Sequence, residues 1–85
     1  MKLPILESDQ LMPLSKNVGK VIKKRREVMQ LSQREFARRY RGSRTNLGRV
    51  ERGEQSVELN TLERMSVVLE TTPLALLAET EVLAY

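Results

Sequence analysis

Four consecutive side chains, from Ser43 to Asn46, combine hydroxyl, guanidinium and amide groups that can both donate and accept hydrogen bonds. They occupy the first turn of a short predicted helix, which Ser43 would cap and Gly53 would stop. Leu47 and Val50 lie three positions apart and would hold this helix from inside. The first turn would then project outward, a geometry suited to reading the polar groups in a nucleic-acid groove.

The middle of the chain is strongly basic, although the formal net charge of the whole is only +4. Residues 16–52 hold thirteen lysines and arginines against three glutamates, whereas residues 53–85 hold one arginine against six glutamates. A basic block of this size favours a polyanionic partner, with a solvated helical surface as the alternative. Nucleic acid is the polyanion that we expect.

Catalytic chemistry is not expected from this composition. The 85 residues include no histidine, no cysteine and a single aspartate, Asp9, so a thiol nucleophile and thiolate metal ligands are lacking. We expect no catalytic residue, no metal site and no cofactor. No apolar run reaches the roughly 18 residues of a membrane span, and the start does not resemble a secretory signal. The expectation is a cytoplasmic protein without a membrane partner.

The helices that must position the polar row can be placed from start and stop signals. A first helix over residues 17–29 would be capped by Ser15 or Asn17. A second would be capped by Ser32, with Glu35 three positions later completing a capping box.

Two more helices follow the short polar one. The fourth carries leucines at helical spacing from Leu59 to Leu69, and the fifth begins at Pro73 after Thr72. All periodic segments are helical, which predicts an all-α fold. The apolar positions that this spacing assigns to the buried faces are Val18, Val21, Ile22, Met29, Phe36, Ala37, Tyr40, Leu47, Val50, Leu59, Leu62, Met65 and Leu69.

The stretch from Leu31 to Gly53 resembles the lambda-repressor-like, or XRE, helix-turn-helix family. The shared pattern is Leu-Ser-Gln followed by an acidic residue, an apolar residue and Ala, then Ser43 with an apolar residue four positions on, and Glu-x-Gly at its end. The resemblance covers about residues 17–78. Arg44-Thr45 and Glu51-Arg-Gly look most like small stand-alone controller proteins of restriction-modification systems.

This resemblance implies a compact five-helix domain with the helix-turn-helix at its second and third helices, acting as a sequence-specific regulator of transcription on double-stranded DNA. By position, it implies that Arg44, Thr45 and Arg49 face the bases. Arginine can pair with guanine O6 and N7 in a bidentate contact, and a threonine methyl can pack on a thymine methyl. The alternative is that these three residues merely keep a surface helix soluble.

A second set of residues corresponds to phosphate contacts, which fix the register of a protein on the duplex. For two of them, Gln55 and Ser56, a plain loop role is an equal alternative, and Gln55 could instead reach a base. The set comprises Gln33, Ser43, Asn46, Arg52, Gln55 and Ser56.

The resemblance further implies an internal salt bridge between Arg26 and Glu51. The sequence departs from the family pattern at the turn, where Arg41 replaces the usual glycine and Gly42 follows. Either Arg41 adopts a left-handed conformation, or the turn shifts by one residue to use Gly42. Glu70 similarly occupies the position of a glycine stop after the fourth helix.

The family works as homodimers, so the resemblance also implies an inverted-repeat operator. An apolar surface near the C-terminus is the expected dimer interface, with completion of the core as the alternative for its leucines. Its candidate residues are Leu74, Leu77, Val82 and Leu83. RNA polymerase is a further candidate partner.

We divide the chain into an N-terminal arm (residues 1–15), the helix-turn-helix domain (16–79) and a C-terminal tail (80–85). The role of the arm is open. A rival interpretation is an antitoxin-like protein-interaction module, in which the acidic, leucine-containing stretch 70–81 masks a partner. Binding to a labelled DNA duplex distinguishes the two interpretations, because the DNA-binding regulator requires such binding and the protein-interaction module does not.

Overall fold

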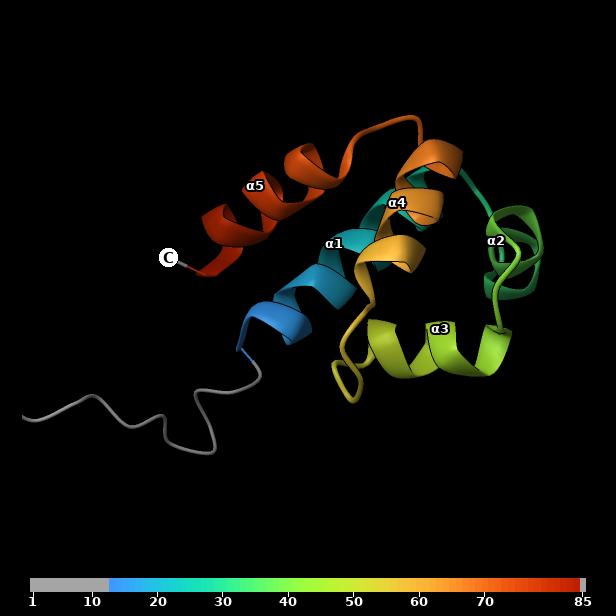
Figure 1. The fold of residues 1–85 in the computed structure, drawn as a ribbon, viewed down its shortest axis with the longest axis horizontal. Helices are drawn as coiled ribbons and strands as arrows, with labels where there is room; N and C mark the ends of the chain where they lie inside the picture. The colour runs from blue at the N-terminus through green and yellow to red at the C-terminus, as the bar shows by residue number, and fades with distance from the viewer. Residues whose placement is uncertain (1–12, 85) are drawn as a thin grey trace, which may run out of the picture.

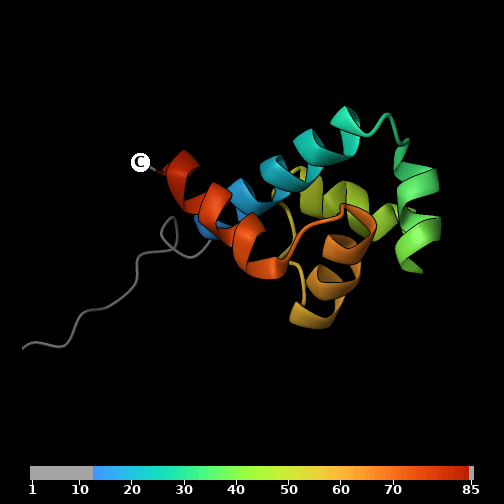
Figure 2. The same ribbon diagram turned by 90° about the horizontal axis from the view of Figure 1, so that it is seen from above.

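The computed structural model describes the backbone of residues 13–84 and the side chains of residues 14–81. These residues contain five helices and no strand, which confirms the all-α prediction. The helices are α1 (Pro13–Val28), α2 (Gln33–Tyr40), α3 (Arg44–Glu51), α4 (Leu59–Val68) and α5 (Pro73–Ala84). In both ribbon views α5 lies alongside α1 (Figures 1 and 2). Helix α3 also packs on α1, whereas α2 packs on α3 and α4.

Serine and threonine side chains cap the starts of three helices, and the sequence predicts the two serine caps. Ser32 Oγ accepts a hydrogen bond from Glu35 N at 3.0 Å, and Ser43 Oγ accepts one from Asn46 N at 3.2 Å. Thr72 Oγ1 does the same for the first turn of α5. Each bond satisfies a backbone N–H that has no partner within its own helix.

The core is built by the inward faces of all five helices. Phe36 and Tyr40 of α2 form its aromatic centre, with an edge-to-face contact at 4.9 Å between ring centroids. The expected apolar positions are buried with two exceptions: Leu59 is 79% exposed, and Met29 is only partly buried. Leu59 is the first residue of α4 and its side chain lies outside the core, so its assignment to the buried face was wrong.

The turn between α2 and α3 resolves the alternative at Arg41 and Gly42. Arg41 adopts the left-handed conformation, with φ 62° and ψ 44°. Gly42 N donates to Ala37 O at 2.8 Å, which closes the end of α2. Gly42 is required for a different reason: a Cβ there would lie 2.0 Å from Tyr40 Cε1. Glu70 also keeps the left-handed conformation expected of a glycine stop, with φ 56°.

Both limits of the first helix differ from those predicted. The first helix begins at Pro13, so Ser15 and Asn17 lie inside it and cap nothing, and it ends at Val28. Proline suits a first helical position, and no residue from 13 to 17 interrupts the helix. Residues 13–15 of the expected arm and residues 80–84 of the expected tail are therefore helical. The rest of the arm, residues 1–12, lies outside the described residues.

Candidate nucleic-acid interface

One side of helix α3 is packed against the core, and the opposite side is exposed to solvent. Leu47 and Val50 are buried in the core. Gly19 of α1 lets the two helices come into backbone contact, since a Cβ on it would lie 2.0 Å from Val50 O. On the other side, Arg44, Thr45, Asn46 and Arg49 are exposed. A rigid helix with one polar exposed face is what reading a DNA groove requires.

The first turn of α3 and the start of α2 border a shallow depression of about 240 Å³. Two predicted base-reading residues, Arg44 and Thr45, line it, and Gly48 forms part of its floor. Gln33 and Arg52, both predicted to contact phosphate, line it as well. Arg49 lies outside the lining; it follows Thr45 by one helical turn.

A buried polar network ties α1, α2 and α3 together behind this depression. Arg26 Nε and Nη2 donate to the two carboxylate oxygens of Glu51, at 2.7 and 3.0 Å. Arg26 Nη1 donates to Leu31 O at 2.7 Å. Gln33 Nε2 donates to Glu51 Oε1 at 2.9 Å, a contact that the sequence did not predict. The network therefore reaches from the core to a residue on the exposed face.

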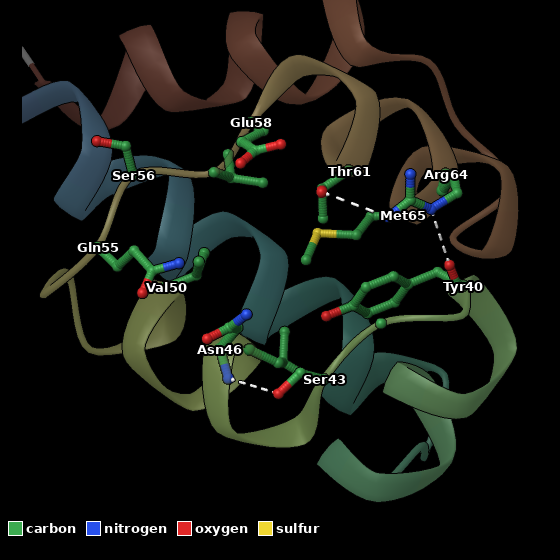
Figure 3. Close-up of a pocket in the computed structure, with 13 residues that line it drawn as sticks. Tyr40, Ser43, Asn46, Val50, Gln55, Ser56, Glu58, Thr61, Arg64 and Met65 are labelled. Atoms are coloured by element: carbon green, nitrogen blue, oxygen red, sulfur yellow. Dashed lines mark hydrogen bonds between the residues drawn. The ribbon is translucent and has the colours of Figure 1, made fainter.

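A second hollow of about 500 Å³ lies on the opposite flank of α3, between that helix and α4 (Figure 3). Four predicted phosphate-contacting residues line it together: Ser43, Asn46, Gln55 and Ser56. Arg64 of α4 lines it too and was missed by sequence reasoning, being a single arginine in an acidic segment. Arg64 Nε donates to Tyr40 O at 3.0 Å, so it also completes the end of α2.

The predicted phosphate contacts thus divide between the two flanks of α3. Gln33 and Arg52 lie on the flank of the depression, and the other four line the second hollow. A helix inserted in a groove has one phosphate backbone on each side, so this division suits a groove-binding helix.

The outer face of α2 carries arginines that are partly neutralised. Glu35 pairs with Arg38 and Arg39, at 2.6 and 3.1 Å. Hydrogen bonds from Arg38 and Arg39, of which the one from Arg38 has the larger effect, lower the pKa of Glu35 from 4.5 to about 2. Glu35 therefore does not complete the predicted capping box, because its carboxylate bonds these arginines rather than the backbone of Ser32.

Helix α5 is held on α1 by an ion pair that the sequence did not predict. Arg25 Nε lies 3.1 Å from both carboxylate oxygens of Glu79, and this contact lowers the pKa of Glu79. Leu76 and Thr80 are buried. Of the expected dimer residues, Leu74 is 78% exposed and Leu77 is half-buried against the core. The side chains of Val82 and Leu83 lie outside the described residues.

Within residues 13–84, no group of three or more acidic, histidine or cysteine side chains is arranged to hold a metal ion. No helix in the same range is long and apolar enough to cross a membrane.

Comparison with known proteins identifies the domain. The helix-turn-helix domain family matches residues 18–79. None of the curated proteins compared with this chain matches it.

Solved structures share the fold. The restriction-modification controller protein C.AhdI from Aeromonas hydrophila is 28% identical, over 72% of this chain and 92% of that protein, with a TM-score of 0.69. Two structures of the clp gene regulator ClgR from Corynebacterium glutamicum are also similar. One is 24% identical over 84% of this chain and 76% of that one, with a TM-score of 0.80. The other is 25% identical over 80% and 88%, with a TM-score of 0.74.

Proposed function

Because this chain belongs to the helix-turn-helix domain family of DNA-binding regulators, we propose that it regulates transcription as a homodimer. The dimer binds an inverted-repeat operator, and α3 enters the major groove of double-stranded DNA.

One observation carries this proposal: α3 has an exposed polar face while its other face is locked into the core. In the proposed complex Arg44, Thr45 and Arg49 face the base edges. The phosphate backbones on either side are contacted by Gln33 on one flank and by Ser43, Asn46, Gln55 and Ser56 on the other. Arginine and threonine are suited to guanine and to the thymine methyl, respectively.

The proposed dimer interface includes the start of α5. Leu74 is a large apolar side chain that remains 78% exposed, although the rest of α5 packs closely on α1. Contiguous exposed apolar surface marks an interaction site, and in the proposed dimer Leu74 forms this surface together with the half-buried Leu77, three positions on in the same helix. A two-fold dimer would place its two α3 helices on half-sites about one helical turn apart, roughly 34 Å.

Titration of a labelled duplex at several salt concentrations tests the proposal directly. Affinity should fall linearly with salt on a logarithmic scale, with a slope of about −0.9 for each phosphate contacted. Selection of bound duplexes from a random pool, followed by footprinting, should then reveal an inverted repeat. A single asymmetric contact would contradict the homodimer, and the absence of salt-sensitive binding to any duplex would contradict the function.

The antitoxin-like alternative needs the stretch 70–81 to be available to a partner. Part of that stretch already serves the fold, since Leu76 is buried and Glu79 pairs with Arg25. We therefore rank DNA binding first. RNA polymerase remains a candidate partner at the promoter, and a duplex target is compatible with the expected cytoplasmic location.

A further inference from the structure

Arg52, for which the sequence predicts a phosphate contact, lines the same depression as two of the proposed base-reading residues. It follows the last residue of α3, and its guanidinium lies near Gly48, four positions earlier on the helix. A Cβ built on Gly48 would lie 3.0 Å from Arg52 Nη1 and 4.0 Å from Gln33 Nε2. The Arg52 guanidinium therefore lies over Gly48 and beside Gln33, in the same depression as Arg44 and Thr45.

Glu54 holds this guanidinium from one side. Its Oε2 accepts from Arg52 Nε at 3.0 Å and lies 2.9 Å from Arg52 Nη2. The left-handed Gly53, with φ 75°, turns the chain so that Glu54 N donates to Arg49 O at 2.9 Å. The backbone of Glu54 is thereby held close to the end of α3.

The pairing leaves one edge of Arg52 available. Glu54 occupies the edge of the guanidinium that is formed by the Nε N–H and one N–H of Nη2. The remaining edge is formed by one N–H of Nη1 and the second N–H of Nη2. Two parallel N–H groups on this edge match the O6 and N7 acceptors of guanine. An acidic residue here would repel a phosphate, but it can orient an arginine that reads a base.

From this geometry we propose that Arg52 is a specificity-determining residue that reads a guanine, and that Glu54 positions it. Gly48 makes this possible because a side chain there would occupy the place of the guanidinium. The inference rests on the proposed function, since it assigns a role within the same DNA interface. It adds a fourth base-reading position, near the C-terminal end of α3.

The two roles of Arg52 predict different effects of neutralising Glu54. If Arg52 reads a base, Glu54→Gln weakens the preference for one guanine in each half-site, because the arginine is no longer held. If Arg52 contacts a phosphate, Glu54→Gln strengthens binding to all duplexes alike, because a repulsive charge is removed.

The experiment compares sequence preferences, selected from a random duplex pool, for the unmodified protein and for Arg52→Ala, Glu54→Gln and Arg38→Ala. Arg38 is the matched control, an exposed arginine that is also paired with a glutamate but lies on α2. Arg52→Ala should abolish the preference for one guanine per half-site and weaken operator binding about tenfold or more. Glu54→Gln should weaken the same preference, and Arg38→Ala should leave all preferences unchanged.

Unchanged preferences in Arg52→Ala, with a uniform loss of affinity, would overturn the assignment of Arg52 while leaving the proposed function intact. Failure of the unmodified protein to bind any duplex would instead overturn the proposed function, and this inference with it. Thermal melting followed by circular dichroism verifies that each variant is folded.

Discussion

Gln33 Nε2 donates a hydrogen bond to Glu51 Oε1 at 2.9 Å, which joins the exposed start of α2 to the buried end of α3. Glu51 also receives two bonds from Arg26. One carboxylate therefore stabilises the scaffold and orients a residue at the proposed interface. The two roles can be separated by changing one partner at a time.

Glu51→Ala should destabilise the fold by about 3–5 kcal/mol, because it leaves the buried Arg26 guanidinium without its carboxylate. Gln33→Ala should lower the free energy of unfolding by no more than about 3 kcal/mol, because it removes one hydrogen bond to a charged group. Gln33 is only half-buried, which reduces the loss further. Urea denaturation measures both losses. A loss below 1 kcal/mol for Glu51→Ala would show that the pair contributes little to stability.

Arg44→Ala should relax the sequence preference at one position in each operator half-site. Lys16→Ala is the comparison, because Lys16 contacts Gly53 at the end of α3 but lies outside the depression. We expect Lys16→Ala to weaken binding to all duplexes nearly equally. The slope of the logarithm of affinity against the logarithm of salt concentration should fall by the amount of about one phosphate contact. Affinities for operator and unrelated duplexes, measured by fluorescence anisotropy, test this; equal losses in both variants would refute base reading by Arg44.

Glu70→Gly should stabilise the protein by about 0.5–1 kcal/mol, because a left-handed backbone strains any residue with a Cβ. The melting temperature should rise by a few degrees. Glu63→Gly, on the exposed side of α4, should have the opposite effect and cost about 1 kcal/mol. A decrease in both variants would mean that the side chain of Glu70 contributes more than its backbone strain costs.

Leu74→Glu should shift the protein from dimer to monomer, because it introduces a charge into the proposed interface. Leu59→Glu is the matched control, since Leu59 is 79% exposed and Leu74 is 78% exposed. Sedimentation velocity without DNA measures the oligomeric state of both. A dimer that survives Leu74→Glu would place the interface elsewhere.

The ion pairs of Glu35 should make stability depend on pH. Its pKa is about 2 in the folded protein and lies below its ordinary value of 4.5. This group therefore stabilises the fold above pH 4.5, and its contribution is lost as the pH falls from 4.5 towards 2. Because the pair is exposed, we expect a small effect that added salt weakens further.

Glu35→Gln tests this dependence, since it removes the titrating group and keeps the side-chain size. Between pH 5 and pH 3, the melting temperature of the variant should decrease less than that of the unmodified protein. The remaining acid sensitivity should come from carboxylates such as Glu79, whose pKa is also lowered. Identical pH profiles would show that the Glu35 pairs do not stabilise the fold.

Local signals in the sequence determined the helix-turn-helix. Ser32 and Ser43 set the starts of α2 and α3 through bonds to backbone groups three residues away, so no distant partner was needed to place them. The spacing of Leu47 and Val50 identified the buried side of α3 for the same reason. Gly19 offered a signal that was not used, because a glycine inside an amphipathic helix usually marks a close packing contact.

Helix α5 shows what a local pattern could not decide. Its leucines occur all around the helix, so periodicity did not distinguish the buried Leu76 from the exposed Leu74. Contact with α1 makes that choice, and the pairing of Arg25 with Glu79 joins residues 54 positions apart.

The composition and motif of the sequence therefore determined the fold class, the family and the exposed face of α3. Only the tertiary structure decided the conformation of Arg41, the contact of Gln33 with Glu51 and the position of Arg52 over Gly48. Each of these depends on side chains or backbone that folding brings together, and their geometry is fixed only when the helices pack.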